Sequence, residues 1–69
     1  MQLHQLLRHI TDGTRIMLFD LKGNNILKVN SKLDIPVDLY EYVVLEFTVG
    51  VFDMYYTELN WGLYITLQK

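Results

Sequence analysis

The chain has no cysteine, one proline and one serine among its 69 residues. Without cysteine it can hold neither a disulfide framework nor a thiolate that binds a metal or attacks a substrate. Its four glycines are scattered, so no glycine-rich loop is present to cradle a phosphate. The only serine, Ser31, has no histidine near it in the sequence to activate it. These absences argue against nucleophilic catalysis and phosphate chemistry.

Metal ligands and catalytic acids are scarce as well. His4 and His9 are the only histidines, and they are five residues apart. Two ligands on one helical face need a spacing of three or four instead. Glu46, Asp53 and Glu58 remain as general acid–base candidates, but surface acids of this kind are common. We therefore expect no enzymatic activity, no metal and no cofactor.

The chain also lacks a long apolar run. No stretch approaches the roughly 20 apolar residues that cross a bilayer as a helix, and the longest run is interrupted by Glu46 and Gly50. The N-terminus does not carry a basic segment followed by an apolar one, as a secretory signal would. We expect a cytoplasmic protein without membrane contact.

Hydrophobic residues, in contrast, make up 51% of a chain short enough to be one domain over residues 1–69. A single core of this size supplies only about 3–5 kcal/mol of stability. Small domains without disulfides or metals often gain the rest by oligomerising. We expect a homo-oligomer.

Charge is divided unevenly along the chain. Residues 1–32 carry five bases against two acids, whereas residues 33–68 carry six acids and neither Lys nor Arg. The acidic half also holds all five tyrosines, the only tryptophan and two of the three phenylalanines. Such asymmetry indicates a partner recognised by charge, or neighbouring copies whose halves complement each other.

The first half predicts a helix followed by a β-hairpin. Apolar residues take the spacing of one helical face at Leu3, Leu6, Leu7 and Ile10. Asp12-Gly13 ends this helix, because glycine accepts the left-handed conformation. Strands are expected over residues 15–21 and 26–29, joined by a turn at 22–25 where Gly and Asn tolerate positive φ.

The second half predicts two strands after an irregular segment. Pro36 excludes a central strand within residues 30–41, and Asp38 is expected to cap a short helical turn over 39–42. A strand over 42–52 places on one face, taken as the core face, Val43, Leu45, Phe47, Val49 and Val51. A last strand over 62–68 buries Leu63, Ile65 and Leu67. The stretch between them is expected as a long hairpin loop or an extra short strand through Tyr55 and Tyr56.

These elements predict an α+β fold in which an N-terminal helix packs on a four- to five-stranded antiparallel meander sheet. A small, strongly bent SH3-like barrel is the alternative. In either fold Gly50, in the middle of the longest strand, is the expected site of a bulge or bend.

The segment 52–61 is the strongest candidate for a binding site, because aromatic residues and Met are enriched in the centres of interfaces. Acids beside them would steer a basic partner. The predicted partner-binding residues are Glu46, Asp53, Tyr55, Tyr56, Glu58 and Trp61. Two alternatives stay open. Tyr55, Leu59 and Trp61 fold back as core, or Tyr42, Phe52 and Tyr64 line an outer face that pairs with a second copy.

A leucine-rich helix, Asp12-Gly13-Thr14, an apolar strand, Lys22-Gly23-Asn24 and a second strand make up residues 3–36, with a loop that carries Ile35-Pro36. This layout resembles that of small accessory proteins encoded by phages and prophages. The resemblance implies a non-enzymatic accessory factor, and acid-rich proteins of this population include inhibitors of bacterial defence systems. It assigns no role to any residue of this chain.

We therefore expect a protein-binding module that acts on a host protein with a basic surface, as an accessory factor or an inhibitor of a host defence enzyme. A self-assembling structural subunit is the alternative. Nucleic-acid binding through Arg8, Arg15, Lys28 and Lys32 is the third possibility, and it is disfavoured because the aromatic residues accompany acids that repel phosphate.

Overall fold

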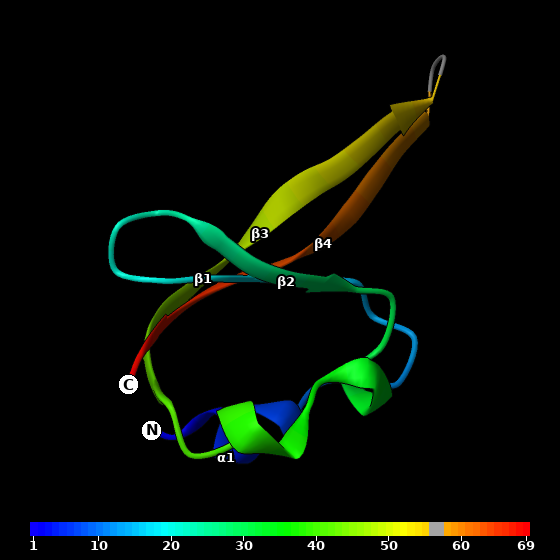
Figure 1. Ribbon diagram of the computed structural model, residues 1–69. Helices are drawn as coiled ribbons and strands as arrows, with labels where there is room; N and C mark the ends of the chain where they lie inside the picture. Colours follow the sequence, from blue (N-terminus) through cyan, green and yellow to red (C-terminus); the bar gives the residue numbers. More distant parts are fainter. Residues whose placement is uncertain (56–57) are drawn as a thin grey trace.

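The structure, a computed structural model, describes residues 1–55 and 58–69, and side chains within residues 1–50 and 61–69. Along the chain follow α1 (Leu3–Leu7), β1 (Ile16–Phe19), β2 (Asn25–Val29), the short 3-10 helices η1 (Lys32–Asp34) and η2 (Val37–Leu39), β3 (Val43–Tyr55) and β4 (Glu58–Gln68). The helical segments gather at one end of the molecule, and the β3–β4 hairpin runs away from them (Figure 1).

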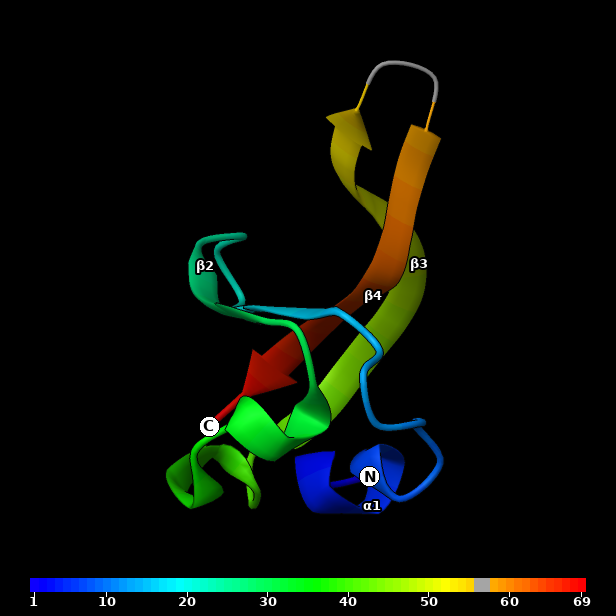
Figure 2. The same ribbon diagram turned by 90° about the vertical axis from the view of Figure 1, so that its right-hand side faces the viewer.

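The four strands form one open sheet in the order β2-β1-β4-β3. β1 and β2 pair antiparallel, as do β3 and β4, but β1 and β4 pair in parallel. The α+β class is confirmed, whereas the predicted antiparallel meander is wrong, because β2 and β3 lie at opposite edges. The strand order differs from a meander because residues 30–42 carry the chain through η1 and η2 from one edge of the sheet to the other (Figure 2). The described strands close no SH3-like barrel.

The core lies between the helical segments and the two central strands. Ile16 and Leu18 of β1 and Ile65 of β4 are wholly inaccessible to solvent, and Leu67 nearly so. The remaining buried side chains are Leu3, Leu6, Leu7, Ile10, Val29 and Ile35. The predicted burial of the β4 residues Ile65 and Leu67 is confirmed, and Leu63 packs against the same cluster.

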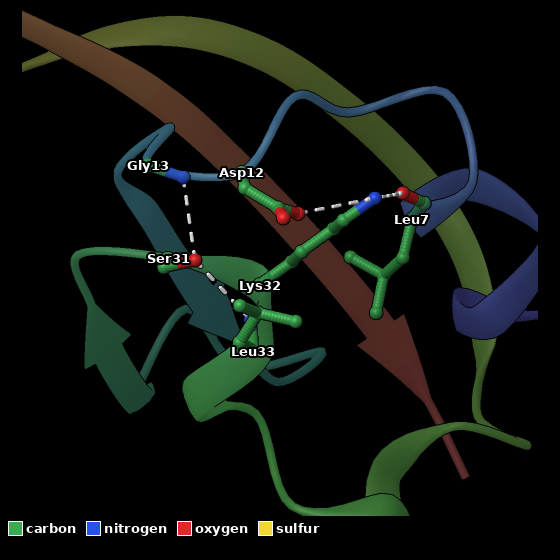
Figure 3. A network of polar contacts seen from close by, with 6 residues as sticks. All are labelled: Leu7, Asp12, Gly13, Ser31, Lys32 and Leu33. Carbon is green, nitrogen blue, oxygen red and sulfur yellow. Dashed lines mark hydrogen bonds and ion pairs between the residues drawn. The ribbon is translucent and has the colours of Figure 1, made fainter.

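The N-terminal helix is shorter than its apolar spacing predicts. α1 has five residues, too few to be stable alone, and packing of Leu3 and Leu6 holds it on the sheet. Ile10 is buried in the turn that follows, and Gly13 takes the expected positive φ of 88°. This turn is tied to the segment after β2 by the side chains of Ser31 and Lys32 (Figure 3).

The predicted β1–β2 hairpin is confirmed, with Ile16 paired to Val29 and Gly23 at φ 83° in its turn. The short helical turn after Pro36 also forms, but it begins two residues earlier than predicted. η2 spans Val37–Leu39 with Pro36 at its N-cap, so Asp38 lies inside the turn and does not cap it. Proline suits the start of a helical turn because its φ is already fixed near the helical value.

The core face predicted for β3 is wrong at the start of the strand, and the burial predicted for its later residues is wrong too. Leu45 has no partner in β4, since Val44 pairs with Leu67 and Glu46 with Thr66. This bulge changes the alternation of the strand, so that Val44 is the residue that packs against the core. The four predicted core residues with described side chains, Val43, Leu45, Phe47 and Val49, are 42–61% exposed. The fifth, Val51, lies outside the described side chains.

The outer part of the β3–β4 hairpin is a two-stranded ribbon. β1 pairs only with the Leu63–Thr66 stretch of β4, so the residues before Leu63 have β3 as their one described neighbour. Gly50 pairs in register with Gly62, and the bulges lie on either side of it, at Val44/Glu46 and Val51/Asp53. The stretch predicted as a loop or an extra strand extends the two long strands instead, with Tyr56 outside the described residues.

Candidate functional site: an apolar face on the β3–β4 hairpin

Three large apolar side chains are exposed together on the β3–β4 hairpin. Phe47 is 54% exposed, Val49 61% and Trp61 55%. We call these three residues the hairpin patch. Together they expose roughly 300 Å² of apolar surface, judged from the size of such side chains. A patch of this extent is within the range that on other monomers often marks a functional surface.

The register places the hairpin patch on the same side of the sheet as the core. Phe47 is opposite Ile65 and Val49 is opposite Leu63, and residues opposite each other share a face. Trp61 is two residues from Leu63 on β4, so it also faces this side. The patch is therefore an extension of the core face that nothing in the described chain covers.

The helical segments cover only the base of β3. The Leu3 amide donates to the Tyr42 carbonyl at 2.8 Å, and the Val44 amide donates to the Met1 carbonyl at 2.7 Å. These contacts hold the N-terminal segment beside the first residues of β3. Beyond them the hairpin rises out of the body of the molecule, as two perpendicular views show (Figures 1 and 2).

Two other exposed apolar side chains lie outside the sheet. Leu33 is 72% exposed and Val37 70%, each in a short 3-10 turn. Single exposed apolar residues are normal on protein surfaces. Leu33 and Val37 are thus matched controls for the hairpin patch.

The predicted partner-binding residues are placed only in part. Trp61 belongs to the hairpin patch and is 55% exposed, which contradicts the alternative that it folds back as core, while its role as a partner contact stays a prediction. Glu46 is exposed too, but it pairs with Thr66 and so faces the opposite side of the sheet. Asp53, Tyr55 and Glu58 lie on the strands with side chains outside the described set, as does all of Tyr56, and their roles stay predictions. Sequence reasoning missed Phe47 and Val49 by assigning them to the core.

The basic residues considered for nucleic-acid binding differ in how exposed they are to solvent. Arg8 and Lys28 are exposed, and Arg15 is half-buried. Lys32 Nζ donates to the Leu7 carbonyl at 2.9 Å and lies 3.6 Å from the Asp12 carboxylate (Figure 3). The Lys32 ammonium therefore stabilises the C-terminal end of α1, and its charge is engaged within the protein.

The pKa of the Asp20 carboxyl, in the turn between β1 and β2, is shifted by hydrogen bonds from the backbone. The amides of Asn24 and Lys22 both donate to Asp20 Oδ1 at 2.9 Å. The bond from the Asn24 amide holds the pKa of the Asp20 carboxyl below its ordinary value of 3.8; desolvation opposes this in part, and the bond from the Lys22 amide adds a smaller lowering. This carboxylate stabilises a turn and faces no candidate site.

Polar side chains that catalysis would use have structural partners. The Ser31 hydroxyl accepts hydrogen bonds from the amides of Gly13 and Leu33 (Figure 3). His4 Nε2 lies 2.8 Å from the Gln2 side-chain oxygen. A surface hollow of about 630 Å³ is an open depression lined by His4, Val37, Asp38, Tyr40 and Glu41. It lacks the enclosing apolar walls of a ligand pocket.

No family model, curated protein or solved structure matches the chain. Among residues 1–55 and 58–69, no helix has the length and apolar character to cross a membrane. The same residues contain no cluster of three or more His, Cys, Asp or Glu side chains suited to a metal ion. A proposal for function therefore depends on the hairpin patch.

Proposed function

We propose that the chain is a cytoplasmic, non-enzymatic protein-binding module that docks on its partner through the hairpin patch. The supporting observation is the exposure of Phe47, Val49 and Trp61 on the face that elsewhere forms the core. Large aromatic side chains supply contact area at low entropic cost and recur among binding hot spots. A partner that covers them removes apolar surface from water, which stabilises the complex by about 25 cal/mol for each Å² buried.

The negative charge of the hairpin indicates a partner with a basic surface. Residues 33–68 contain no Lys or Arg, and the acids on the hairpin are Glu46, Asp53 and Glu58. A partner with an apolar groove and a basic rim would be attracted at long range and held at the patch. In its most specific form, the proposal is an accessory factor of phage type that occupies a basic, nucleic-acid-facing surface of a host defence enzyme.

The experiment is a pull-down from bacterial lysate with the tagged chain, after nuclease treatment and at low and moderate salt. We compare the wild type with the pair Phe47→Thr/Trp61→Thr and with the control pair Leu33→Thr/Val37→Thr. Threonine keeps β-propensity while removing the apolar contact area. We expect the patch pair to lose a partner that the control pair retains. Equal retention by both pairs would contradict docking through the hairpin patch.

A further inference from the structure

β3 is an edge strand whose outer side is open over most of its length. The N-terminal segment occupies that side only at its start, where Gln2 bridges to Val43 and the Val44 amide bonds to the Met1 carbonyl. From Leu45 onward no described strand pairs with it. An open edge of apolar, β-branched residues is a template for pairing with another strand.

The hydrogen bonds of β4 show which backbone groups of β3 point to this open side. The Leu63 amide donates to the Arg15 carbonyl of the segment before β1, so Leu63 directs its backbone groups away from β3. Val49 is opposite Leu63 in the antiparallel ladder, and residues at such a position direct their backbone groups away from each other. The amide and carbonyl of Val49 therefore lie at the open edge. Those of Phe47, two residues earlier, do so too, while Thr48 between them faces β4.

We propose that a second copy of this chain occupies the edge, with two β3 strands paired antiparallel about a two-fold axis at Thr48. In this register Phe47 is opposite Val49 of the second copy, and the two residues exchange both backbone hydrogen bonds. Thr48 is opposite its own equivalent. Glu46 is opposite Gly50 of the second copy. The pairing uses residues 46–50, the regular part of β3 between its two bulges.

The strand complements itself in this register. Phe47 with Val49 is an aromatic–β-branched pair, and Thr48 with Thr48 is a hydroxyl pair; both kinds stabilise adjacent strands. Glu46 is the only charged residue from 45 to 50, and meeting Gly50 keeps it away from its own equivalent. A foreign strand would need to match this pattern, whereas a second copy matches it by symmetry.

Pairing also changes the size of the apolar surface. One hairpin patch of roughly 300 Å² is smaller than the ~800 Å² that each partner buries in a stable complex. Two-fold pairing places the patches of both copies side by side on one face of a continuous sheet and doubles the area. In this respect the inference rests on the proposed function, because the joined patches form its docking surface.

A cysteine at the axis tests the register directly, because the natural chain has no cysteine. Across a pair without mutual hydrogen bonds the Cα atoms lie about 4.5 Å apart, which falls within the range of disulfides. We expect Thr48→Cys to form a disulfide-linked dimer in a glutathione redox buffer. The matched control is Thr11→Cys, also an exposed threonine, which we expect to stay monomeric. Equal cross-linking of both variants, or none with Thr48→Cys, would overturn the proposal.

A second variant tests the edge without cysteine. Val49→Pro removes an amide that points to the open side, so the β3–β4 ladder keeps its bonds while each dimer loses two. Val49→Ile is the control that keeps the amide and an apolar, β-branched side chain. By sedimentation equilibrium we expect Val49→Pro to raise the dimer dissociation constant at least tenfold and Val49→Ile to change it little. If Val49→Pro leaves the dimer dissociation constant unchanged, the dimer does not form through the open edge of β3 and the proposal is wrong.

The two proposals fail separately. A chain that dimerises with these variant effects but captures no partner contradicts the proposed function alone. A monomeric chain that still captures a partner through the hairpin patch contradicts this inference alone. If Val49→Pro fails to fold, the comparison of Thr48→Cys with Thr11→Cys decides the question.

Discussion

The aromatic ring of Tyr64 on β4 lies over Gly50 on β3, so close that a Cβ atom at residue 50 would overlap the ring. The same ring meets Phe19 of β1 edge to face, with centroids 5.4 Å apart. Tyr64 therefore packs across three neighbouring strands, on the face of the sheet opposite the core. Gly50 is the residue that makes room for it.

Replacement of Gly50 by alanine tests this contact. We expect Gly50→Ala to lower the free energy of unfolding by about 1–3 kcal/mol, as overpacking does elsewhere. In a Tyr64→Ala background the cost of Gly50→Ala should largely disappear, because the ring is gone. Urea unfolding of the four chains in this double-mutant cycle measures the coupling. Equal costs in both backgrounds would show that the ring is not the obstacle.

Lys32 provides a second stability prediction. Its Nζ bonds to the Leu7 carbonyl at the end of α1, and it is only 22% exposed, whereas its partner Asp12 is 63% exposed. Lys32→Ala should lower the free energy of unfolding by about 1–2 kcal/mol, since it removes a charged donor from the Leu7 carbonyl, which keeps only the bond from the Ile10 amide. Asp12→Ala should cost less than about 1 kcal/mol, because exposed ion pairs contribute little. Thermal unfolding compares the two, and a larger loss with Asp12→Ala would reverse this ranking.

Asp20 gives a pH dependence with a definite sign. Because its pKa is lowered in the folded chain, its contribution to stability is present above the ordinary value of 3.8 and is lost as the pH falls through the folded value. Asp20→Asn keeps the acceptor oxygen but cannot titrate. We expect the stability difference between wild type and Asp20→Asn to shrink as the pH falls below 4. A difference that is independent of pH would contradict the role of the charged carboxylate.

The acids of the hairpin predict a rate effect on binding. Asp53→Asn/Glu58→Gln should slow association with the captured partner and flatten its salt dependence, because long-range attraction is screened by salt. Asp38→Asn/Glu41→Gln removes the same charge from exposed residues near η2 and is the matched control. Stopped-flow association at two salt concentrations separates the pairs. Similar slowing by both would indicate that only net charge matters.

The sequence predicted those elements whose apolar pattern is local. The helical spacing of Leu3, Leu6, Leu7 and Ile10 identified the N-terminal part of the core, and alternation identified Ile65 and Leu67 of β4. The β1–β2 hairpin followed from its turn, where Gly23 needs positive φ. Each of these signals lies within a few residues along the chain.

Two features could not be predicted in this way. The parallel pairing of β1 with β4 depends on the path of residues 30–42, which carry no strand or long-helix pattern. The bulge at Leu45 depends on how β3 fits against β4 and the N-terminal segment. One extra residue at the bulge puts Val43 and Leu45 out of the predicted alternation. Phe47 and Val49 do lie on the core side of the sheet, but the helical segments cover only the start of β3 and leave them exposed. Because Phe47 and Val49 were predicted to be buried, the exposed hairpin patch was not predicted.

Amide hydrogen exchange at Val49 tests most directly the claim that the open side of the β3–β4 hairpin is an association surface. In an isolated chain the Val49 amide points to solvent and should exchange much faster than the Thr48 amide, which faces β4. If the edge is paired, Val49 should be protected at high protein concentration and lose protection on dilution, while Thr48 changes little. Fast exchange of Val49 at every concentration, with Thr48 protected throughout, would contradict association through this edge.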